Sequence, residues 1–328
     1  MRKLLTAALV GGGIALGALS STAALAEKWN MPVRSNERNY FTQNIMQFAD
    51  EVKKATGGDL EIVIHPEDSL FKQPDVKRAV QTGQVQIGEL LMSMHSNESP
   101  IYGVDSIPFL ATDYEQGAKL LKAARPLIEE RLKKQGMRLL FVVPWPFNSI
   151  YSGQEVDSVD DFKGVKFRAF NPVTARLAEL MGAVPVTVQQ SEVSQAFSTG
   201  VIQAMITSPA TGVDTQAWDF VKYFYDVRAM APWNIVIVNE RMFSRLDKNR
   251  QEAVLAAAKA AEERGWKKAP AVTSELIDTL RSHGMEIRQP SPELKAGLHK
   301  IGDTLIQEWI ASASDDGKKV MEQFRKAD

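Results

Sequence analysis

The chain of 328 residues contains no cysteine. This absence excludes disulfide bonds, a lipid anchor on a cysteine, thiolate catalysis and cysteine-ligated metals. Only four histidines are present, and none has a second histidine at the spacing of a metal site. We therefore expect a fold that packing alone holds together, with no bound metal ion and no cofactor.

The sequence also lacks the short motifs of common hydrolases, metalloenzymes and nucleotide-binding proteins. It has no Gly-x-Ser-x-Gly elbow, no His-Glu-x-x-His helix and no Gly-x-x-x-x-Gly-Lys loop. Charge is nearly balanced, with 39 basic and 40 acidic residues, so we expect no nucleic acid as a partner. An exported enzyme whose site is assembled from distant residues stays open as an alternative.

Long apolar runs are absent except near the N-terminus. There, two basic residues precede the apolar stretch 4–19, and alanines follow at positions 24 and 26. This order is typical of a secretory signal peptide over residues 1–26, with Glu27 as the first mature residue. A membrane anchor is the alternative, but the apolar stretch is short for a span and ends in small polar residues.

After position 27, short strand-like runs alternate with amphipathic helical runs, which is typical of an α/β fold. The expected strands are 28–33, 60–65, 86–92, 138–143, 165–170, 184–188 and 202–207, with two more extended runs within 224–238. The expected helices are 36–55, 74–82, 114–135, 172–181, 193–198 and 248–280, and a last helix begins at Ser291-Pro292-Glu293. The stretch 96–108 follows neither pattern.

The order of these elements predicts two α/β lobes with a ligand cleft between them. We expect lobe 1 to comprise residues 27–150, with 235–285 returning to it, and lobe 2 to comprise 151–234. Residues 286–328 are expected to form a C-terminal helical segment that braces both lobes. Because no flexible linker is visible, the lobes are expected to be joined by several crossing strands.

Several short motifs occur in a characteristic order. They are IPFL at 107–110, SVDDFKGVKFR at 158–168, MGAVP at 181–185 and SEVSQAF at 191–197. Together they resemble the solute receptors of tripartite ATP-independent periplasmic (TRAP) transporters, the DctP family. The resemblance extends over essentially the whole chain after the signal peptide.

The resemblance implies a two-lobe periplasmic binding protein fold with an interlobe cleft and a long C-terminal helix. It also implies a periplasmic protein, not an enzyme, that captures a small organic acid by lobe closure and delivers it to TRAP membrane permease subunits. The alternative is a stand-alone periplasmic ligand-sensing module for a membrane sensor kinase, whose lobes would look the same.

Arg168, at the end of an expected strand, falls on the carboxylate-binding arginine of the family. A guanidinium presents a planar fork of donors that matches a carboxylate and keeps its charge. On the neighbouring strand end, Thr207 and Ser208 stand where family members often have an asparagine, and both can hydrogen-bond a carboxylate or hydroxyl. Asn148, near the expected interlobe crossover, and Gln190 are further expected ligand residues.

Trp233 completes the set of expected ligand-binding residues. It follows Pro232 at a second expected crossover, while Trp145 and Phe147 flank a proline at the first. The ordinary role of such side chains is packing between lobes. If they line the cleft, we expect a mostly apolar monocarboxylate rather than a sugar acid.

Overall fold

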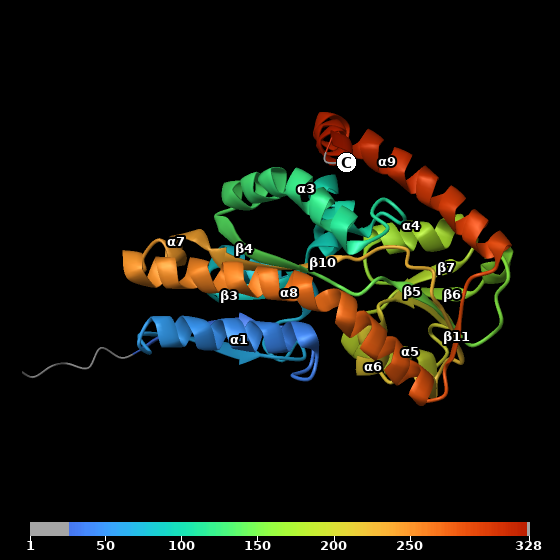
Figure 1. Cartoon of the computed structure of the whole chain (residues 1–328), viewed down its shortest axis with the longest axis horizontal. Helices are drawn as coiled ribbons and strands as arrows, with labels where there is room; N and C mark the ends of the chain where they lie inside the picture. Colours follow the sequence, from blue (N-terminus) through green and yellow to red (C-terminus); the bar gives the residue numbers. More distant parts are fainter. Residues whose placement is uncertain (1–25, 327–328) are drawn as a thin grey trace, which may run out of the picture.

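The computed structural model of the chain describes residues 26–326. The expected signal peptide lies outside the described residues, apart from Ala26, so it stays a prediction. The rest forms two α/β lobes that lie side by side along the long axis of the molecule (Figure 1). The expected α/β fold is confirmed.

Lobe 1 contains two small sheets. In one, β1 (Glu27–Pro32) pairs in parallel with β2 (Leu60–His65). In the other, β10 (Trp233–Asn239) lies between β3 (Ile87–Leu91) and β4 (Met137–Pro144) and is antiparallel to both. The helices that flank these sheets are α1 (Tyr40–Ala55), α2 (Gln73–Thr82), α3 (Tyr114–Lys134), α7 (Glu240–Phe243), η1 (Met92–His95) and η2 (Pro100–Ser106).

Lobe 2 is built on one six-stranded sheet in the order β11-β9-β5-β8-β6-β7. Its strands are β5 (Ser149–Ser152), β6 (Lys166–Ala169), β7 (Val184–Thr187), β8 (Ala204–Thr207), β9 (Tyr223–Tyr225) and β11 (Glu286–Arg288). Its helices are α4 (Pro172–Leu180), α5 (Val193–Ser198), α6 (Pro209–Asp214), η3 (Val159–Phe162), η4 (Gln190–Glu192) and η5 (Ala217–Asp219).

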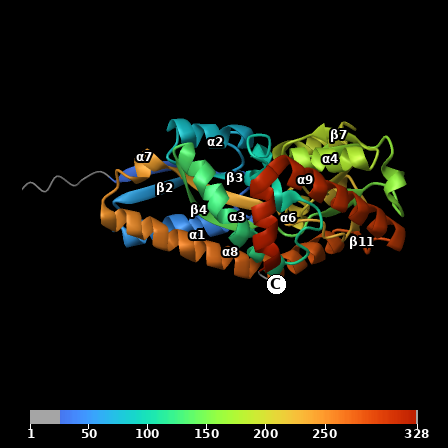
Figure 2. The same cartoon turned by 90° about the horizontal axis from the view of Figure 1, so that it is seen from above.

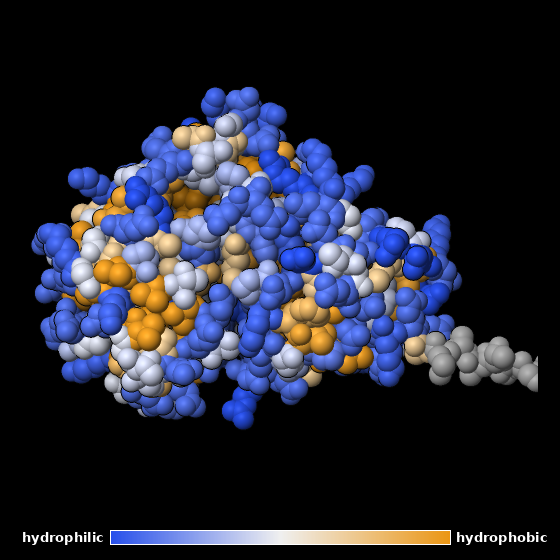
Figure 3. Space-filling model, turned by 180° about the vertical axis from the view of Figure 1, so that it is seen from behind, coloured by the Kyte–Doolittle hydropathy of each residue, from blue (hydrophilic) through white to orange (hydrophobic). Residues whose placement is uncertain are grey.

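Two long helices connect the lobes. α8 (Lys248–Ser282) packs against α1 and β4 in lobe 1 and against α6 and β11 in lobe 2. α9 (Pro292–Lys326) contacts α3 and η2 on one side and α4 and η3 on the other. α9 lies over the junction of the lobes (Figure 2) and is broken at Ser314, whose φ is 54°. Figure 3 shows the face opposite to that of Figure 1, which is mostly covered by hydrophilic side chains, with apolar ones in separate patches.

Two chain crossings between the lobes are bonded to each other. The backbone N–H of Asn148 donates to the carbonyl of Met230 (2.7 Å), and that of Ala229 donates to the carbonyl of Asn148 (2.9 Å). The N–H of Trp145 donates to the carbonyl of Pro232 (2.7 Å). The segments that follow β4 and precede β10 therefore form a short two-stranded connection that holds the lobes together.

The lobe boundaries differ from those expected at four places. Trp233 and Asn234, expected in lobe 2, belong to β10 and pair with β4 in the sheet of lobe 1. Ser149 and Ile150, expected in lobe 1, already pair with β8 and β9 in the sheet of lobe 2. The end of α8 leaves lobe 1 and packs on α6, and β11 joins the sheet of lobe 2 rather than belonging to a purely helical brace. These short strands are fixed by tertiary pairing, which a local sequence pattern does not report.

Candidate functional site

Strand ends of lobe 2 meet at the edge of the sheet that faces lobe 1. β6 and β8 are parallel, with Arg168 level with Met205, so their carboxyl ends lie at the same edge. β5 is antiparallel to β8, and its first residue, Ser149, pairs with Thr207. Asn148, directly before Ser149, therefore lies at this edge too. Ligands of open α/β sheets bind at such carboxyl ends.

Arg168, at this edge, is fully buried with most of its donors unpaired. Its side chain is 0% exposed, and its Nε donates to the carbonyl of Val188 (3.0 Å). Both terminal nitrogens, Nη1 and Nη2, have no hydrogen-bond partner among the described residues. The guanidinium carbon lies 5.5 Å from the centroid of the Phe170 ring. Because buried polar groups are nearly always paired, this fork of donors is positioned for a group that the protein itself does not supply.

Next to Arg168 lies a cavity between the lobes, which we call the interlobe cavity. Its lining combines apolar and aromatic side chains with hydroxyl, amide and guanidinium groups from both lobes: Arg34, Leu91, Trp145, Asn148, Phe170, Thr207, Ser208, Thr211 and Pro232. Arg168 does not line this cavity itself, but Phe170, beside its guanidinium, does.

Lobe 1 contributes a second arginine. Arg34 lies two residues after the end of β1 and is 8% exposed, and its Nε has no hydrogen-bond partner in the described part of the chain. Its backbone N–H donates to Glu89 Oε2 (2.9 Å), and its guanidinium carbon lies 5.5 Å from the Trp145 ring centroid. Glu89 Oε1 also accepts a hydrogen bond from the amide of Asn234. The carboxylate of Glu89 thus fixes the backbone that presents Arg34.

Burial shifts the pKa values of these groups in the directions that favour their neutral forms. Burial lowers the pKa of the Arg168 guanidinium to about 9, and the positive charge of Arg34 acts in the same direction. Burial also raises the pKa of the Glu89 carboxyl to about 7, against the effect of hydrogen bonds and charge from Arg34. An anion beside Arg168 would oppose this shift, so the site is electrostatically prepared for a carboxylate.

Hydrogen bonds also cross between the lobes beside the cavity. Asn171 of lobe 2 donates from Nδ2 to Ser93 Oγ (2.8 Å) and Ser106 Oγ (3.0 Å) of lobe 1. On another path, Asn39 Nδ2 of lobe 1 donates to Asp214 Oδ2 of lobe 2 (2.7 Å). The structure therefore describes the two lobes in contact with each other.

The structure brings three of the expected ligand residues together with Arg168. Asn148, Thr207 and Ser208 all line the interlobe cavity. Ser208 has a second task, because its Oγ accepts from the backbone N–H of Thr211 (3.1 Å) and so caps α6.

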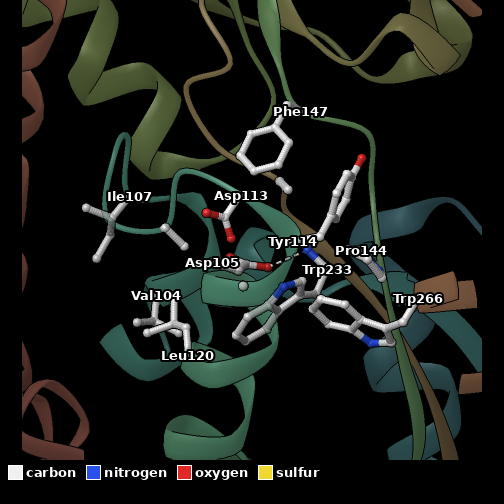
Figure 4. A pocket seen from close by; sticks show the side chains of 13 residues that line it. Val104, Asp105, Ile107, Asp113, Tyr114, Leu120, Pro144, Phe147, Trp233 and Trp266 are labelled. Atoms are coloured by element: carbon white, nitrogen blue, oxygen red, sulfur yellow. Dashed lines mark hydrogen bonds between the residues drawn. The ribbon is translucent and has the colours of Figure 1, made fainter. Parts of the chain in front are cut away.

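Gln190 and Trp233 lie elsewhere. Gln190 does not line the interlobe cavity; its Nε2 donates to Asp214 Oδ2 (3.0 Å), while its Oε1 lacks a described partner. Trp233 lines a second cavity, which it shares with the indole of Trp266 and the rings of Phe147 and Tyr114 (Figure 4). Trp233 shares this second cavity with residues of η2 and α3, so its role in ligand binding stays a prediction.

Arg34 lines the interlobe cavity but was not among the expected ligand residues, and Trp145 was named only as a side chain that could line the cleft. Like Arg168, Arg34 is an arginine near the end of a strand, and its side chain faces the other lobe. It lies in none of the family motifs, however. Trp145, rather than Trp233, is the crossover tryptophan of this cavity, and its Nε1 donates to Asn234 Oδ1 (2.7 Å). Which of the two tryptophans faces the cleft depends on strand twist, which sequence spacing does not report.

Within residues 26–326, no cluster of three or more acidic or histidine side chains is arranged to hold a metal ion. In the same part of the chain, no helix combines the length and the apolar character needed to cross a bilayer.

Comparison with known proteins gives the family. Residues 33–312 match the bacterial extracellular solute-binding proteins, family 7, or DctP. Among solved structures, the Bordetella pertussis extracytoplasmic solute receptor DctP7, which binds pyroglutamic acid, is 50% identical, with a TM-score of 0.90 over 92% of this chain and 100% of that chain. DctP6 of the same organism, also with pyroglutamic acid, is 43% identical at the same TM-score and the same coverage of both chains.

A third structure, a TRAP solute-binding protein from a marine metagenome with co-purified pyroglutamate, is 38% identical. It covers 92% of this chain and 99% of its own, with a TM-score of 0.90. The match over residues 33–312 and these likenesses agree with the geometry of a two-lobed receptor that encloses a small cavity. The chain belongs to family 7 of the bacterial extracellular solute-binding proteins, the solute receptors of TRAP transporters.

Proposed function

We propose that this chain is the periplasmic receptor of a TRAP-type importer and that it captures pyroglutamate, a small cyclic monocarboxylate, for delivery to the membrane permease. Family membership supports the receptor role. Three relatives that are 38% to 50% identical each bind pyroglutamate, which supports the same ligand here.

The observation that carries the proposal is the buried, unpaired fork of Arg168. In an open, wet cleft an arginine–carboxylate pair contributes about 0–1 kcal/mol. When the lobes close and water leaves, hydrogen bonds to charged groups contribute about 1.5–3 kcal/mol each. The ligand thus favours the closed state, and the closed shape is the one that the permease receives.

The lining of the interlobe cavity supports an acid that has both an apolar and a polar side. The rings of Trp145 and Phe170 and the apolar Leu91 and Pro232 bound part of this cavity. Hydroxyl and amide groups stand at the strand ends of lobe 2. A five-membered ring with one carboxylate and one amide meets both kinds of surface, whereas a long sugar acid needs more hydroxyl partners.

Calorimetric titration with L-pyroglutamate tests the ligand. We expect a single site per chain and a clear rise in melting temperature, because a ligand at 100 times its dissociation constant stabilises the protein by about 2.7 kcal/mol. Succinate and glucuronate serve as comparison acids and are expected to bind much more weakly. No binding of pyroglutamate, or stronger binding of either comparison acid, would contradict the ligand assignment.

An uptake assay distinguishes the receptor of an importer from a ligand-sensing module. Proteoliposomes that contain a cognate TRAP permease are expected to accumulate labelled pyroglutamate only when the receptor is added. Binding without uptake would favour the sensing module. Ligand recovered chemically changed after prolonged incubation would instead indicate an enzyme.

A further inference from the structure

Arg34 faces the interlobe cavity from the lobe opposite Arg168. It is 8% exposed, its Nε has no partner among the described residues, and it shares the cavity lining with Thr207 and Ser208 of lobe 2. A ligand held between Arg168 and lobe 1 therefore meets Arg34. The family comparison assigns no role to this residue.

The two arginines differ in their surroundings. Arg34 lies near three buried or partly buried acids, Glu89, Asp68 and Asp214, whose negative charges favour its charged form. For Arg168, the only acid with such an influence is Glu192, an exposed residue. Burial lowers the pKa of Arg34, and the carboxyl groups around it oppose this shift, whereas Arg168 has no buried carboxyl with that effect among the described residues.

This imbalance decides which ligand group goes where. A carboxylate gains most beside Arg168, because no buried acid there competes for the guanidinium. A second carboxylate beside Arg34 would lie close to Glu89 and Asp68, and like charges in a buried site repel strongly. A neutral acceptor, such as a carbonyl oxygen, can take the unpaired Nε–H of Arg34 without that repulsion.

We propose that Arg34 is the specificity-determining residue of this receptor and that its Nε donates to the ring carbonyl of pyroglutamate while Arg168 holds the carboxylate. This inference rests on the proposed function and defines its ligand class further. The site selects acids with one negative charge and a neutral acceptor on the side that faces lobe 1. The two donors, one from each lobe, make the same ligand bridge the closed cleft.

A comparison of two ligands on two variants tests the inference. Cyclopentanecarboxylate keeps the five-membered ring and the carboxylate of pyroglutamate but lacks both the carbonyl and the ring N–H. Arginine can only donate hydrogen bonds, so any energetic coupling between Arg34 and this change in the ligand reports the carbonyl. The protein variants are Arg34→Gln and, as a matched control, Arg38→Gln, which alters an exposed arginine outside the cavity lining.

In calorimetric titrations, Arg34→Gln is expected to weaken pyroglutamate binding about ten- to hundredfold and cyclopentanecarboxylate binding less than about threefold. Arg38→Gln should change neither by more than about threefold. Equal losses for both ligands in Arg34→Gln would overturn the inference, because Arg34 would then act through lobe packing or overall charge. An unchanged affinity for pyroglutamate would overturn it as well.

Two further outcomes keep the test decisive. If Arg34→Gln does not fold, Arg34→Lys retains the positive charge among the acids but moves the donor, and the same selective loss for pyroglutamate is expected. If the wild-type chain binds neither acid, the proposed function fails and this inference fails with it. If the wild type binds pyroglutamate and the two losses are equal, only the inference fails.

Discussion

Arg168 is a buried cation with one hydrogen bond from its side chain to the protein, to the carbonyl of Val188. Leaving a charged donor unpaired in a buried place costs free energy. Strongly perturbed charged groups beside a cavity mark functional sites more often than structural ones. The guanidinium of Arg168 is therefore positioned to bind a ligand.

Replacing Arg168 by methionine should remove ligand binding without unfolding the protein. Loss of one partner from a buried charge pair costs about 3–5 kcal/mol, so pyroglutamate affinity is expected to fall by two orders of magnitude or more. The unliganded variant should melt no lower than the wild type, because a buried, largely unpaired charge has been removed. Titration calorimetry and thermal melting measure the two effects.

Lys166→Met is the matched control, since Lys166 lies on the same strand but is exposed. It should leave affinity within about twofold of the wild type. Near-wild-type affinity in Arg168→Met would contradict the assignment of the carboxylate.

Asp105 lies in the second cavity, where its Oδ2 accepts from the backbone N–H of Trp233 (2.7 Å). Burial raises the pKa of this carboxyl from 3.8 to about 7. Between these values the folded protein holds a proton that the unfolded chain has released, so the contribution of Asp105 to stability falls as pH rises from about 4 to 7. Asp105→Asn cannot titrate and should lack this loss.

Urea unfolding of the wild type and Asp105→Asn at pH 4.5 and pH 7.5 measures the difference. The variant should gain stability relative to the wild type at the higher pH. An equal difference between the two proteins at both pH values would show that the carboxyl does not titrate in this window.

The sequence predicted part of this site for a clear reason. Arg168 lies within a family motif near the end of a strand. Thr207 and Asn148 were found by their positions in the sequence relative to this motif. Arg34 lies in no such motif, and its approach to the cavity depends on closure of one lobe on the other. A contact made only between lobes leaves no local pattern, so nothing in the sequence singled out Arg34.

At the scale of elements, α4 links helix capping to lobe contact. Asn171 caps α4 because its Oδ1 accepts from the backbone N–H of Thr174 (2.8 Å), while its Nδ2 reaches Ser93 and Ser106 of lobe 1. The same side chain thus fixes the helix start and ties it to the other lobe. Closure should therefore depend on the amide but not on the cap.

Asn171→Ser separates these roles, because serine caps helices about as well as asparagine but does not extend as far. Loss of two hydrogen bonds across the lobes, at about 1 kcal/mol each, should weaken pyroglutamate binding about ten- to hundredfold through faster dissociation. Ser93→Ala removes one of them and should give roughly half the free-energy effect. Stopped-flow dissociation rates measure both, and unchanged rates would show that these bonds do not stabilise the closed state.

Long periodic elements were predicted well, and short ones only in part. The helix expected at 248–280 is found as Lys248–Ser282, and the expected cap at Ser291 accepts a hydrogen bond from the backbone N–H of Leu294 (2.9 Å). The short elements β6, β7, β8 and α5 were expected and are found, whereas β5, α6, α7 and β11 were missed. An apolar pattern that repeats over many turns identifies a helix, whereas a short element depends more on partners from elsewhere in the chain.

At the scale of the whole molecule, two bonded crossings and two shared helices join the lobes. Such connections permit hinge rotation while they restrict sliding. The cavity lies between the lobes, with Arg34 from one and Thr207 from the other in its lining. Ligand binding and lobe closure should therefore be one coupled event.

Small-angle X-ray scattering measures this coupling. Saturating pyroglutamate is expected to reduce the radius of gyration of the wild type, because contacts with both lobes shift the population toward the closed form. Arg168→Met at the same ligand concentration should keep the larger radius. A wild type that is equally compact with and without ligand would show that closure does not depend on the acid.

A crystal structure of the chain grown with L-pyroglutamate would show directly whether Arg168 binds the ligand carboxylate. We expect the ligand in the interlobe cavity, with its carboxylate oxygens about 2.7–2.9 Å from Nη1 and Nη2 of Arg168. A ligand bound in the second cavity, or one in the interlobe cavity that leaves both nitrogens of Arg168 unpaired, would contradict it.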